Sequence, residues 1–338
     1  KETARNVCED IPFLNMDIFV YILSSSIETM DLQQIERALQ VRYIKLHFGL
    51  YLVEDSRLPM NKVSAIRGGI GEMLLRANCI RDRNCGECDF ENECIVRRTI
   101  YSQFEEKPKF VTSGESAGYV LECENYEVEF QRGDILEFQL LLFGKTIIYF
   151  SQFVQAIYQF GRVGIGKEHS CYEIAYIRNT QGKDILKRQD ICMDQCKVLT
   201  LWDYIQYRQK QCSDRENRIR FKTPVTLKYQ GNFQQSLSME AVLPAVLRRI
   251  YIMDCFEGLG CEELHWDEGL PGVLQETSHP ITVNRYSSTQ NQKMPLRGIK
   301  GEMLLSGISE KLLPILLAGE ILHIGKNTSF GFGRYHIF

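Results

Sequence analysis

The sequence lacks the features that would place it in a membrane or on a secretory route. Its 338 residues contain no apolar run of about 18 residues, the length that a transmembrane helix requires. No basic segment followed by an apolar core and a small-residue cleavage site occurs at the start, so no signal peptide is predicted. The chain begins at Lys1 rather than at a methionine, which leads us to expect a trimmed or partial chain. We expect a cytoplasmic protein without a membrane partner.

An excess of positive charge is also absent. The chain has 40 Lys and Arg residues against 43 Asp and Glu residues, a formal net charge of −3 at pH 7. Overall charge therefore does not indicate a nucleic-acid-binding protein, and any such binding has to come from local groups of basic residues. The length is sufficient for two modest domains, each with its own core.

Cysteine is abundant, with 12 residues, but it is not distributed like a disulfide framework. Most cysteines outside one cluster are isolated on apolar stretches, where free cysteine behaves as a small buried hydrophobe, and we expect a reducing compartment. The cluster has spacing typical of tetrahedral zinc ligands. Its polar surroundings cannot form a core without a metal, so we predict structural zinc, with an iron–sulfur cluster as the alternative. The cluster consists of Cys79, Cys85, Cys88 and Cys94.

A glycine-rich segment near the C-terminus is the most distinctive motif. Gly325, Gly331 and Gly333 surround the polar residues 326–329, and Arg334 follows. Glycine adopts positive φ and allows close approach, so that successive N–H groups can converge on an anion. With its basic residues, the loop is suited to hold phosphodiester oxygens. A glycine-rich hairpin with incidental basic residues is the alternative.

Hydrophobic periodicity predicts two similar halves, each with a strand and helix followed by a strand, helix and strand. Each half places a glycine-containing loop before its last strand, at Gly161–Lys167 and at Gly325–Lys326. We therefore predict an α+β fold of two tandem ferredoxin-like (βαββαβ) domains with a cysteine-rich insert. In the first half the strands are expected at 41–53, 134–143 and 171–177, and the helices at 62–78 and 149–160. In the second half the strands are expected at 220–229, 302–306 and after Lys326, and the helices at 239–253 and 310–317, the latter ending at Gly319.

The predicted organisation has four parts. In the last part, the region from the end of the helix at 239–253 to Pro280 is expected to be a long loop. The parts are a helical N-terminal extension at 1–39, a first ferredoxin-like domain at 40–178 with the cysteine insert at 79–94, a connector at 179–217, and a second ferredoxin-like domain at 218–338 with the C-terminal glycine-rich loop.

A nine-residue motif occurs in both halves. Arg67-Gly-x-x-Gly-Glu-Met-Leu-Leu recurs from Arg297, but we predict a helix at the first copy and a strand at the second. Gly68, Gly69 and Gly71 cost the helix about 1 kcal/mol each relative to alanine. This cost predicts that another part of the chain or a ligand closely approaches that helix.

Together these motifs resemble the CRISPR-associated RAMP proteins, and more closely the bacterial endoribonucleases of that group that process precursor CRISPR RNA. The resemblance covers roughly residues 40–338 in order. It rests on the C-terminal loop Gly325–Tyr335, Leu58-Pro59 ahead of Arg67-Gly-x-x-Gly71, the cysteine insert, and the segments 222–231 and 285–294.

The resemblance implies metal-independent cleavage of CRISPR repeat RNA. The 2′-hydroxyl beside the scissile phosphate attacks it, which gives a 2′,3′-cyclic phosphate and a 5′-hydroxyl, and DNA is excluded because it lacks this hydroxyl. The implied partners are CRISPR repeat RNA or crRNA, together with CRISPR effector or adaptation proteins. Two alternatives are a catalytically inactive RAMP subunit that holds crRNA and a zinc-stabilised interaction module.

Such cleavage needs a base, an acid and cations for the developing charge. The family often has a histidine near its first helix, but this chain has none between Arg57 and Cys94. The candidates for proton transfer are His169, which we prefer because it follows Gly166-Lys167, and His47, Tyr286 and Lys62. The predicted RNA-binding residues are Arg67, Lys167, Arg285, Lys293, Arg297, Gly325, Lys326, Asn327, Thr328, Ser329, Gly331, Gly333 and Arg334.

Overall fold

The structure is a computed structural model, and it describes residues 30–105, 107–111, 116–187, 190–211, 216–287 and 292–338. Most of the predicted N-terminal extension lies outside these ranges. Its described end is helix α2 (Leu32–Ala38), which begins at the N-cap Asp31 and contacts a helix of the second half. Within the described ranges, no helix combines the length and the apolar composition needed to cross a bilayer.

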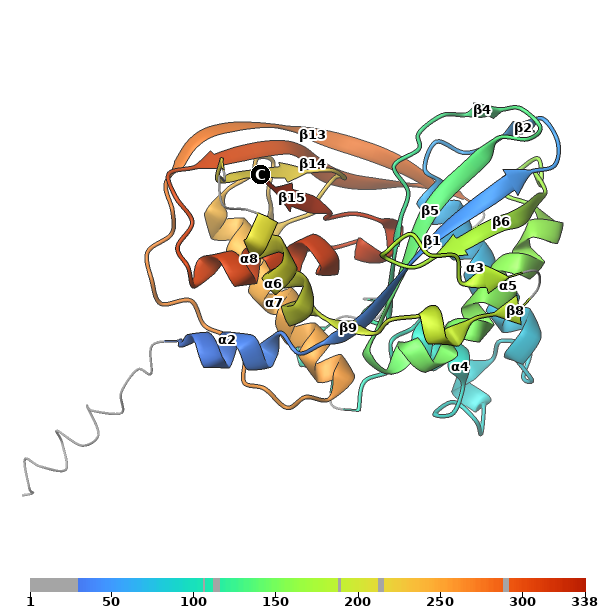
Figure 1. Cartoon of the computed structure of the whole chain (residues 1–338), viewed down its shortest axis with the longest axis horizontal. Helices are drawn as coiled ribbons and strands as arrows, with labels where there is room; N and C mark the ends of the chain where they lie inside the picture. Colours follow the sequence, from blue (N-terminus) through green and yellow to red (C-terminus); the bar gives the residue numbers. More distant parts are fainter. Residues whose placement is uncertain (1–29, 106, 112–115, 188–189, 212–215, 288–291) are drawn as a thin grey trace, which may run out of the picture.

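The first half is an antiparallel sheet with two helices packed on one face (Figure 1). Alternate residues of its central strand β1, such as Leu46 and Phe48, are buried against those helices, as the alternating pattern predicted. The strand order is β3-β5-β1-β6. The elements are β1 (Arg42–Leu52), α3 (Lys62–Asn78), β3 (Tyr119–Glu122), β5 (Ile135–Phe143), α5 (Phe150–Val163) and β6 (Tyr172–Arg178), with the small pair β2 (Ser56–Arg57) and β4 (Glu129–Phe130) and the short helix α4 (Ile95–Thr99).

The second half repeats this order of elements, and its strand order is β13-β14-β10-β15. Helices α7 and α8 pack together against the sheet in a core that α2 also joins. The helices and most of the strands predicted from periodicity are confirmed in both halves, but the strand expected at 220–229 is replaced by the shorter β10 at 218–221. The second strand of each half, β3 and β13, was not located from the sequence. The elements are β10 (Arg218–Phe221), α7 (Met239–Glu257), β13 (Val273–Ser287), β14 (Gln292–Leu305), α8 (Leu312–Leu322) and β15 (Tyr335–Ile337).

Two further sequence expectations for the second half are wrong. The stretch to Pro280 is not all loop, because β13 begins at Val273. Helix α8 does not end at Gly319 but continues to Leu322, and His323 with φ of 56° ends it. Gly319 is required for packing, since a Cβ there would lie 2.1 Å from the hydroxyl oxygen of Tyr335.

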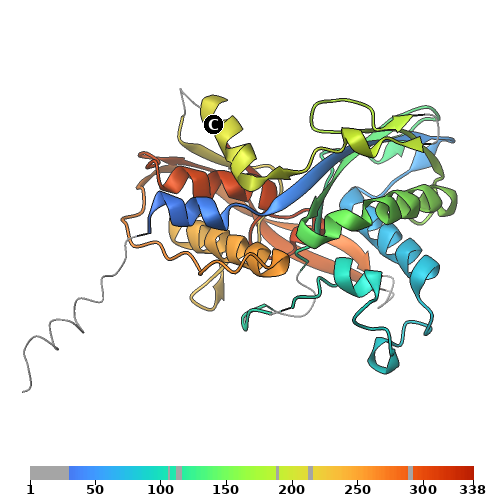
Figure 2. The same ribbon diagram turned by 60° about the horizontal axis from the view of Figure 1, so that its bottom comes forward.

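The segment expected as a connector is largely folded. Strand β9 (Leu199–Thr200) pairs with β1 of the first half, and helix α6 (Leu201–Gln211) packs against α8 of the second half. In Figure 2, α6 lies alongside α8. The segment therefore contacts both halves. A further small pair consists of β7 (Leu186–Lys187) and β8 (Asp190–Ile191).

The repeated nine-residue motif adopts two different structures, as predicted. The first copy lies in α3 and the second lies in β14. In α3, a Cβ on Gly69 would lie 2.2 Å from the ring of Phe160, so the close approach predicted for this helix comes from a side chain of α5. Gly68 and Gly71 have nothing within 4 Å of a built Cβ.

Strands β13 and β14 form a long hairpin that reaches from the second half to the first. Their pairing runs from Val273 opposite Leu305 to Ser287 opposite Gln292. In Figure 1 the hairpin extends over the top of the molecule toward the sheet of the first half. Residues near its tip, including Arg285, therefore lie close to α3.

Candidate functional site

A cavity of about 710 Å³ lies where the hairpin tip meets the first half. Helix α3 forms one wall, and the loop between α5 and β6 forms another. The residues that carry chemistry there are Lys167 and His169 from the loop, Glu72 from α3, and Asn284 and Arg285 from β13. Three of them, Lys167, His169 and Arg285, were predicted from the sequence.

The backbone conformation of His169 and one hydrogen bond of its ring indicate which ring nitrogen carries the proton. His169 has φ of 52°, and Gly164, with φ of 87°, makes room for its carbonyl, because a Cβ on Gly164 would lie 2.0 Å from that oxygen. Its Nδ1 lies 3.1 Å from the carbonyl oxygen of Val163. A carbonyl only accepts, so Nδ1 carries the proton. In the neutral ring, Nε2 then keeps its lone pair, as a general base requires.

Two arginines and one aromatic ring connect α3, the hairpin and the C-terminal loop. The Cζ atoms of Arg67 and Arg285 each lie 4.5 Å from the ring centroid of Phe330. Among the described residues, the buried Nε atoms of both arginines have no hydrogen-bond partner. Burial lowers the pKa of Arg285, and the charge of Arg67 lowers it further. Guanidinium groups are suited to bind phosphate oxygens, and here the buried Nε atoms are not accessible to a ligand, so any such contact falls to the terminal nitrogens.

The C-terminal loop does not form the anion cradle expected from its glycines. It contains a 3₁₀ turn, Thr328–Phe330, that packs on α3 and β3, and Thr328 and Ser329 are buried. The amides of Lys326, Gly331 and Gly333 donate to carbonyl oxygens of Thr226, Thr328 and Pro224. The glycines instead permit close packing, since a Cβ on Gly325 would lie 2.5 Å from the carbonyl oxygen of Thr226.

Arg334 is held by carboxylates of the first half. Its Nη1 donates to Glu124, and its Nε lies 3.4 Å from Oε1 of Glu122. The buried Glu122 also accepts from Lys45 and His323, each at 3.0 Å. Burial alone would raise the pKa of the Glu122 carboxyl, but the charge of Lys45, the hydrogen bond from His323 and the charge of Arg334 together hold it below its usual range.

Two other candidates for proton transfer, Lys62 and His47, are not among the residues that line the cavity of His169. Lys62 is buried at 1% exposure, its Nζ donates to the carbonyl of Glu127 and lies 5.2 Å from the ring centroid of Phe130, and burial lowers its pKa. His47 lines a different cavity beside Glu122, and burial followed by the charge of Lys45 lowers its pKa.

Two more predicted residues pair with each other near the hairpin tip. The backbones of Tyr286 and Lys293 are partners in the β13–β14 register, and their side chains lie outside the described part of the structure. Arg297 is exposed farther along β14, and it lines a cavity in the second half with Lys326 and Asn327.

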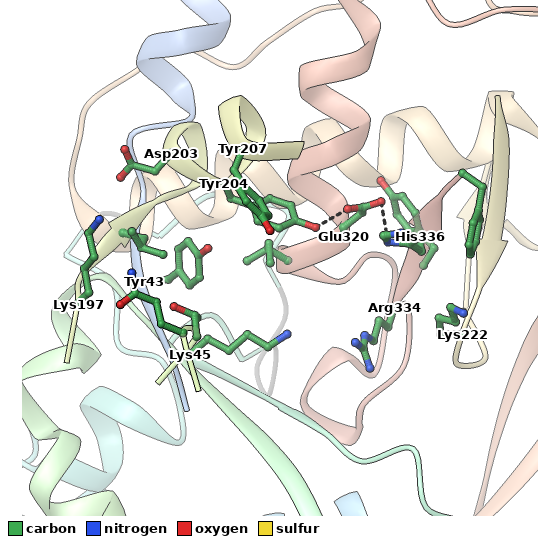
Figure 3. A pocket seen from close by; sticks show the side chains of 16 residues that line it. Tyr43, Lys45, Lys197, Asp203, Tyr204, Tyr207, Lys222, Glu320, Arg334 and His336 are labelled. Carbon is green, nitrogen blue, oxygen red and sulfur yellow. Dashed lines mark hydrogen bonds and ion pairs between the residues drawn. The ribbon is translucent and has the colours of Figure 1, made fainter. Parts of the chain in front are cut away.

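A larger cavity, of about 890 Å³, lies between the two halves, and none of the site residues predicted from the sequence except Arg334 lines it. Lys45, Lys222 and Arg334 line it together with Tyr204 and Tyr207 of α6 (Figure 3). The helical spacing of Tyr204 and Tyr207 is the sequence signal that points to this wall, and it lies within the segment predicted to be a connector.

The side of this cavity formed by the second half is fixed by one buried carboxylate. Glu320 accepts from the hydroxyl of Tyr204, from the backbone amide of Ile337 at 2.6 Å and from Nε of Arg208 at 3.0 Å. The Nδ1 of His336 lies 3.1 Å from Oε1 of Glu320. Figure 3 marks this contact with a dashed line. These contacts hold α6, α8 and β15 together.

The four clustered cysteines line one small cavity of about 270 Å³. In the described ranges, no three His, Cys, Asp or Glu side chains are close enough together to hold a metal ion. The predicted ligands therefore share a cavity without forming a closed coordination sphere.

Comparison with known proteins gives two family matches. Residues 39–200 match the family described as AF_1859_N, N-terminal domain, and residues 219–335 match the CRISPR-associated endoribonuclease Cas6 family. No curated protein matches the sequence.

The fold is similar to that of solved structures. A partial Cas6-RT-Cas1–Cas2 complex has a TM-score of 0.52 at 12% identity, over 88% of this chain and 46% of that chain. The Cas6-RT-Cas1–Cas2 complex gives the same TM-score, identity and coverage of this chain, over 29% of that chain. Thermus thermophilus Cas6 is 11% identical, with a TM-score of 0.46 over 88% of this chain and 99% of that chain. This chain thus spans less than half the length of the first two.

Proposed function

We propose that this protein is an endoribonuclease that processes precursor crRNA by cleaving CRISPR repeat RNA, and the support is that residues 219–335 match the CRISPR-associated endoribonuclease Cas6 family. We assign both halves to the ferredoxin-like fold, and the repeated βαββαβ order supports this assignment. The proposal includes the metal-independent route, in which the 2′-hydroxyl of the RNA is the nucleophile.

The observation that carries the proposal is the hydrogen bond that assigns the ring proton of His169 to Nδ1, in the cavity at the hairpin tip. Its Nδ1 donates to Val163, so Nε2 is the atom that accepts the proton of the 2′-hydroxyl. Lys167 and Arg285 line the same cavity, and their charges stabilise the phosphorane-like transition state. Lys167 is our candidate for the acid that protonates the leaving 5′-oxygen.

RNA phosphates bind, in this proposal, to the cations around the cavity. Arg285 and the exposed Lys167 line the cavity, and the partly exposed Arg67 lies on the ring of Phe330 together with Arg285. Arg334 is engaged by Glu122 and Glu124, so we assign it to holding the two halves together. The buried Lys62 we assign to packing against Phe130, whereas Tyr286 remains a candidate for proton transfer.

The function is tested with labelled repeat RNA in the presence of EDTA. The expected products carry a 2′,3′-cyclic phosphate and a 5′-hydroxyl, and a repeat with a 2′-deoxy substitution at the cleaved position stays intact. If the protein binds repeat RNA but does not cleave it, the result would contradict this proposal and favour a catalytically inactive RAMP subunit. Failure to bind repeat RNA would favour the interaction module.

Adaptation proteins are the proposed protein partners. The support is the structural similarity to Cas6-RT-Cas1–Cas2 complexes, of which this chain spans only a part. Co-purification of the chain with its own Cas1 and Cas2 proteins tests the assignment, and the separate elution of all three would contradict it.

We also propose that Cys79, Cys85, Cys88 and Cys94 hold a structural zinc ion. The support is that all four line one cavity within a polar segment, so metal binding would draw the thiolates together. Metal analysis of protein purified without added metal is expected to give one zinc per chain. Visible absorbance with bound iron would indicate an iron–sulfur cluster instead, and the absence of both would contradict a metal site.

A further inference from the structure

A cavity of about 640 Å³ in the second half takes no part in the proposed reaction. Its size is within the roughly 300–1,000 Å³ range of small-ligand sites. It lies between the middle of the β13–β14 hairpin, the start of the C-terminal loop and a small hairpin of β11 (Lys228–Tyr229) and β12 (Asn232–Phe233). All these walls belong to the second half.

One wall presents an exposed aromatic ring. Phe233 ends β12 with 57% of its surface exposed, although a core position would be the usual place for phenylalanine. The Nζ of Lys326 lies 5.8 Å from its ring centroid, so a cation lies beside the ring. An exposed ring with a neighbouring cation is suited to stack a nucleobase and hold its phosphate.

The charge of the cavity is positive. Arg297 and Lys326 line it, both are exposed, and no carboxylate is among its described lining residues. Neither cation forms an ion pair with a described residue, in contrast to Arg334, which is paired with Glu122 and Glu124. Arg297 and Lys326 are therefore available to an anionic ligand.

Two side-chain amides in the wall donate through their nitrogens, and no residue in the described part of the chain donates to their oxygens. The Nε2 of Gln234 donates to the carbonyl oxygen of Asn232 at 3.1 Å. The Nδ2 of Asn327 lies 3.4 Å from Oγ1 of Thr226, and Asn327 has φ of 65°, which places its side chain at the start of the C-terminal loop. Amide oxygens accept from the amino and imino groups on base edges.

We propose that this cavity binds one unpaired nucleotide of the RNA. The base stacks on Phe233, its edge donates to Gln234 or Asn327, and the adjoining phosphate contacts Arg297 and Lys326. A single-stranded nucleotide fits this chemistry because only an unstacked base has a face available to an aromatic side chain. The inference rests on the proposed RNA-cleaving function and adds a recognition subsite to it.

The test uses repeat RNAs that carry 2-aminopurine at one unpaired position at a time. Stacking on Phe233 quenches this fluorophore, so quenching at one position is expected on binding to the wild-type protein. Phe233→Ala is expected to remove the quenching and to weaken RNA binding about 5- to 150-fold, as loss of one stacking contact does. Phe233→Trp, which keeps a stacking surface, is expected to retain both.

Tyr158→Ala is the matched control. Tyr158 is also exposed, at 52%, with Cζ of Arg162 lying 5.2 Å from its ring centroid, but it is on α5 of the first half. This variant is expected to bind and quench like the wild type. Normal binding and cleavage without a quenched position, or unchanged quenching in Phe233→Ala, would overturn this inference alone. Absence of RNA binding by the wild type would overturn the proposed function and this subsite with it.

Discussion

The Nε2 of His323 lies 3.0 Å from Oε1 of Glu122, and this contact joins residues 201 positions apart in different halves of the chain. Both side chains are buried. Lys45 and Arg334 approach the same carboxylate, so one acidic group from β3 holds three cationic or hydrogen-bonding side chains. The relative position of the two halves depends on this group.

Replacing the carboxylate by an amide tests that dependence. Glu122→Gln removes the negative charge, which leaves the partly buried Lys45 without its ion-pair partner and leaves Arg334 with Glu124 alone. We expect the free energy of unfolding in urea to fall by about 3–5 kcal/mol, the range for breaking a buried ion pair. Glu129→Gln is the control, because the Glu129 side chain is 73% exposed where it pairs with Arg57. That exposed pair is worth roughly 1 kcal/mol or less, and equal losses in the two variants would contradict our interpretation.

Because the pKa of Glu122 is lowered in the folded protein, we expect the free energy of unfolding to depend on pH. The pKa of Glu122 in the folded protein lies below its ordinary value of 4.5, so the folded state binds fewer protons than the unfolded state as the pH falls through 4.5. The stabilisation is therefore complete above pH 4.5 and is lost progressively below it. Unfolding of the wild type and of Glu122→Gln, followed from about pH 7 to pH 3, should show the difference between them shrinking in acid. A constant difference would contradict the prediction.

His169→Asn tests the general base. We expect the cleavage rate to fall about 10²- to 10⁴-fold, as loss of a proton-transfer group does, with RNA affinity unchanged. His265→Asn changes an exposed histidine in the loop after α7 and should cleave normally. A His169→Asn variant with wild-type activity would return the role of base to Tyr286 or another candidate.

Arg67 and Arg285 are expected to act on phosphate rather than on sequence. Arg285→Gln and Arg67→Gln should each weaken binding to every repeat RNA and lower the salt dependence of affinity by about one phosphate contact. The double variant reports whether the two arginines, which share the ring of Phe330, bind one phosphate together. Lys311→Gln is the control, since Nζ of Lys311 pairs with Glu268 at 2.7 Å. An unchanged salt dependence in both arginine variants would exclude direct phosphate contacts.

Two glycines of α3 make a matched pair for stability. Gly69→Ala would place a methyl group within 2.2 Å of the ring of Phe160, and we expect a loss of about 1–3 kcal/mol from overpacking. Gly71→Ala meets nothing within 4 Å and should instead stabilise the helix by up to about 1 kcal/mol. Thermal unfolding of the two variants distinguishes these effects. A stabilised Gly69→Ala variant would show that α3 and α5 separate easily.

Much of the fold was predictable because it depends on local patterns of burial. The two copies of the nine-residue motif were assigned to a helix and a strand from their flanking periodicity, and both assignments are confirmed. Strand β13 was missed because none of its residues with a described side chain is buried. Its pairing with β14 holds it in place, and its apolar alternation is short, with Ile281 and Val283 set against Thr282 and Asn284.

The candidate site was predictable only in part, for a different reason. His169, Lys167 and Arg285 were identified from glycine loops and motifs, and they line one cavity. Glu122 carries no local signal, because its role arises from partners in the other half. The glycines of the C-terminal loop predict backbone N–H groups that converge on an anion. In the structure their positive φ values allow close packing against neighbouring backbone instead.

The length of the β13–β14 hairpin fixes how far the second half can reach. Each residue of an antiparallel strand advances about 3.4 Å, and successive side chains point to opposite faces. Removing one cross-strand pair between Thr282–Arg297 and the tip would therefore withdraw Arg285 from Phe330 and turn it to the other face of the hairpin. Removing two pairs would restore the face but not the reach. The number of residue pairs in the hairpin therefore sets both the reach and the orientation of Arg285. A change in that number during evolution would be tolerated only if the proposed RNA site moved with it.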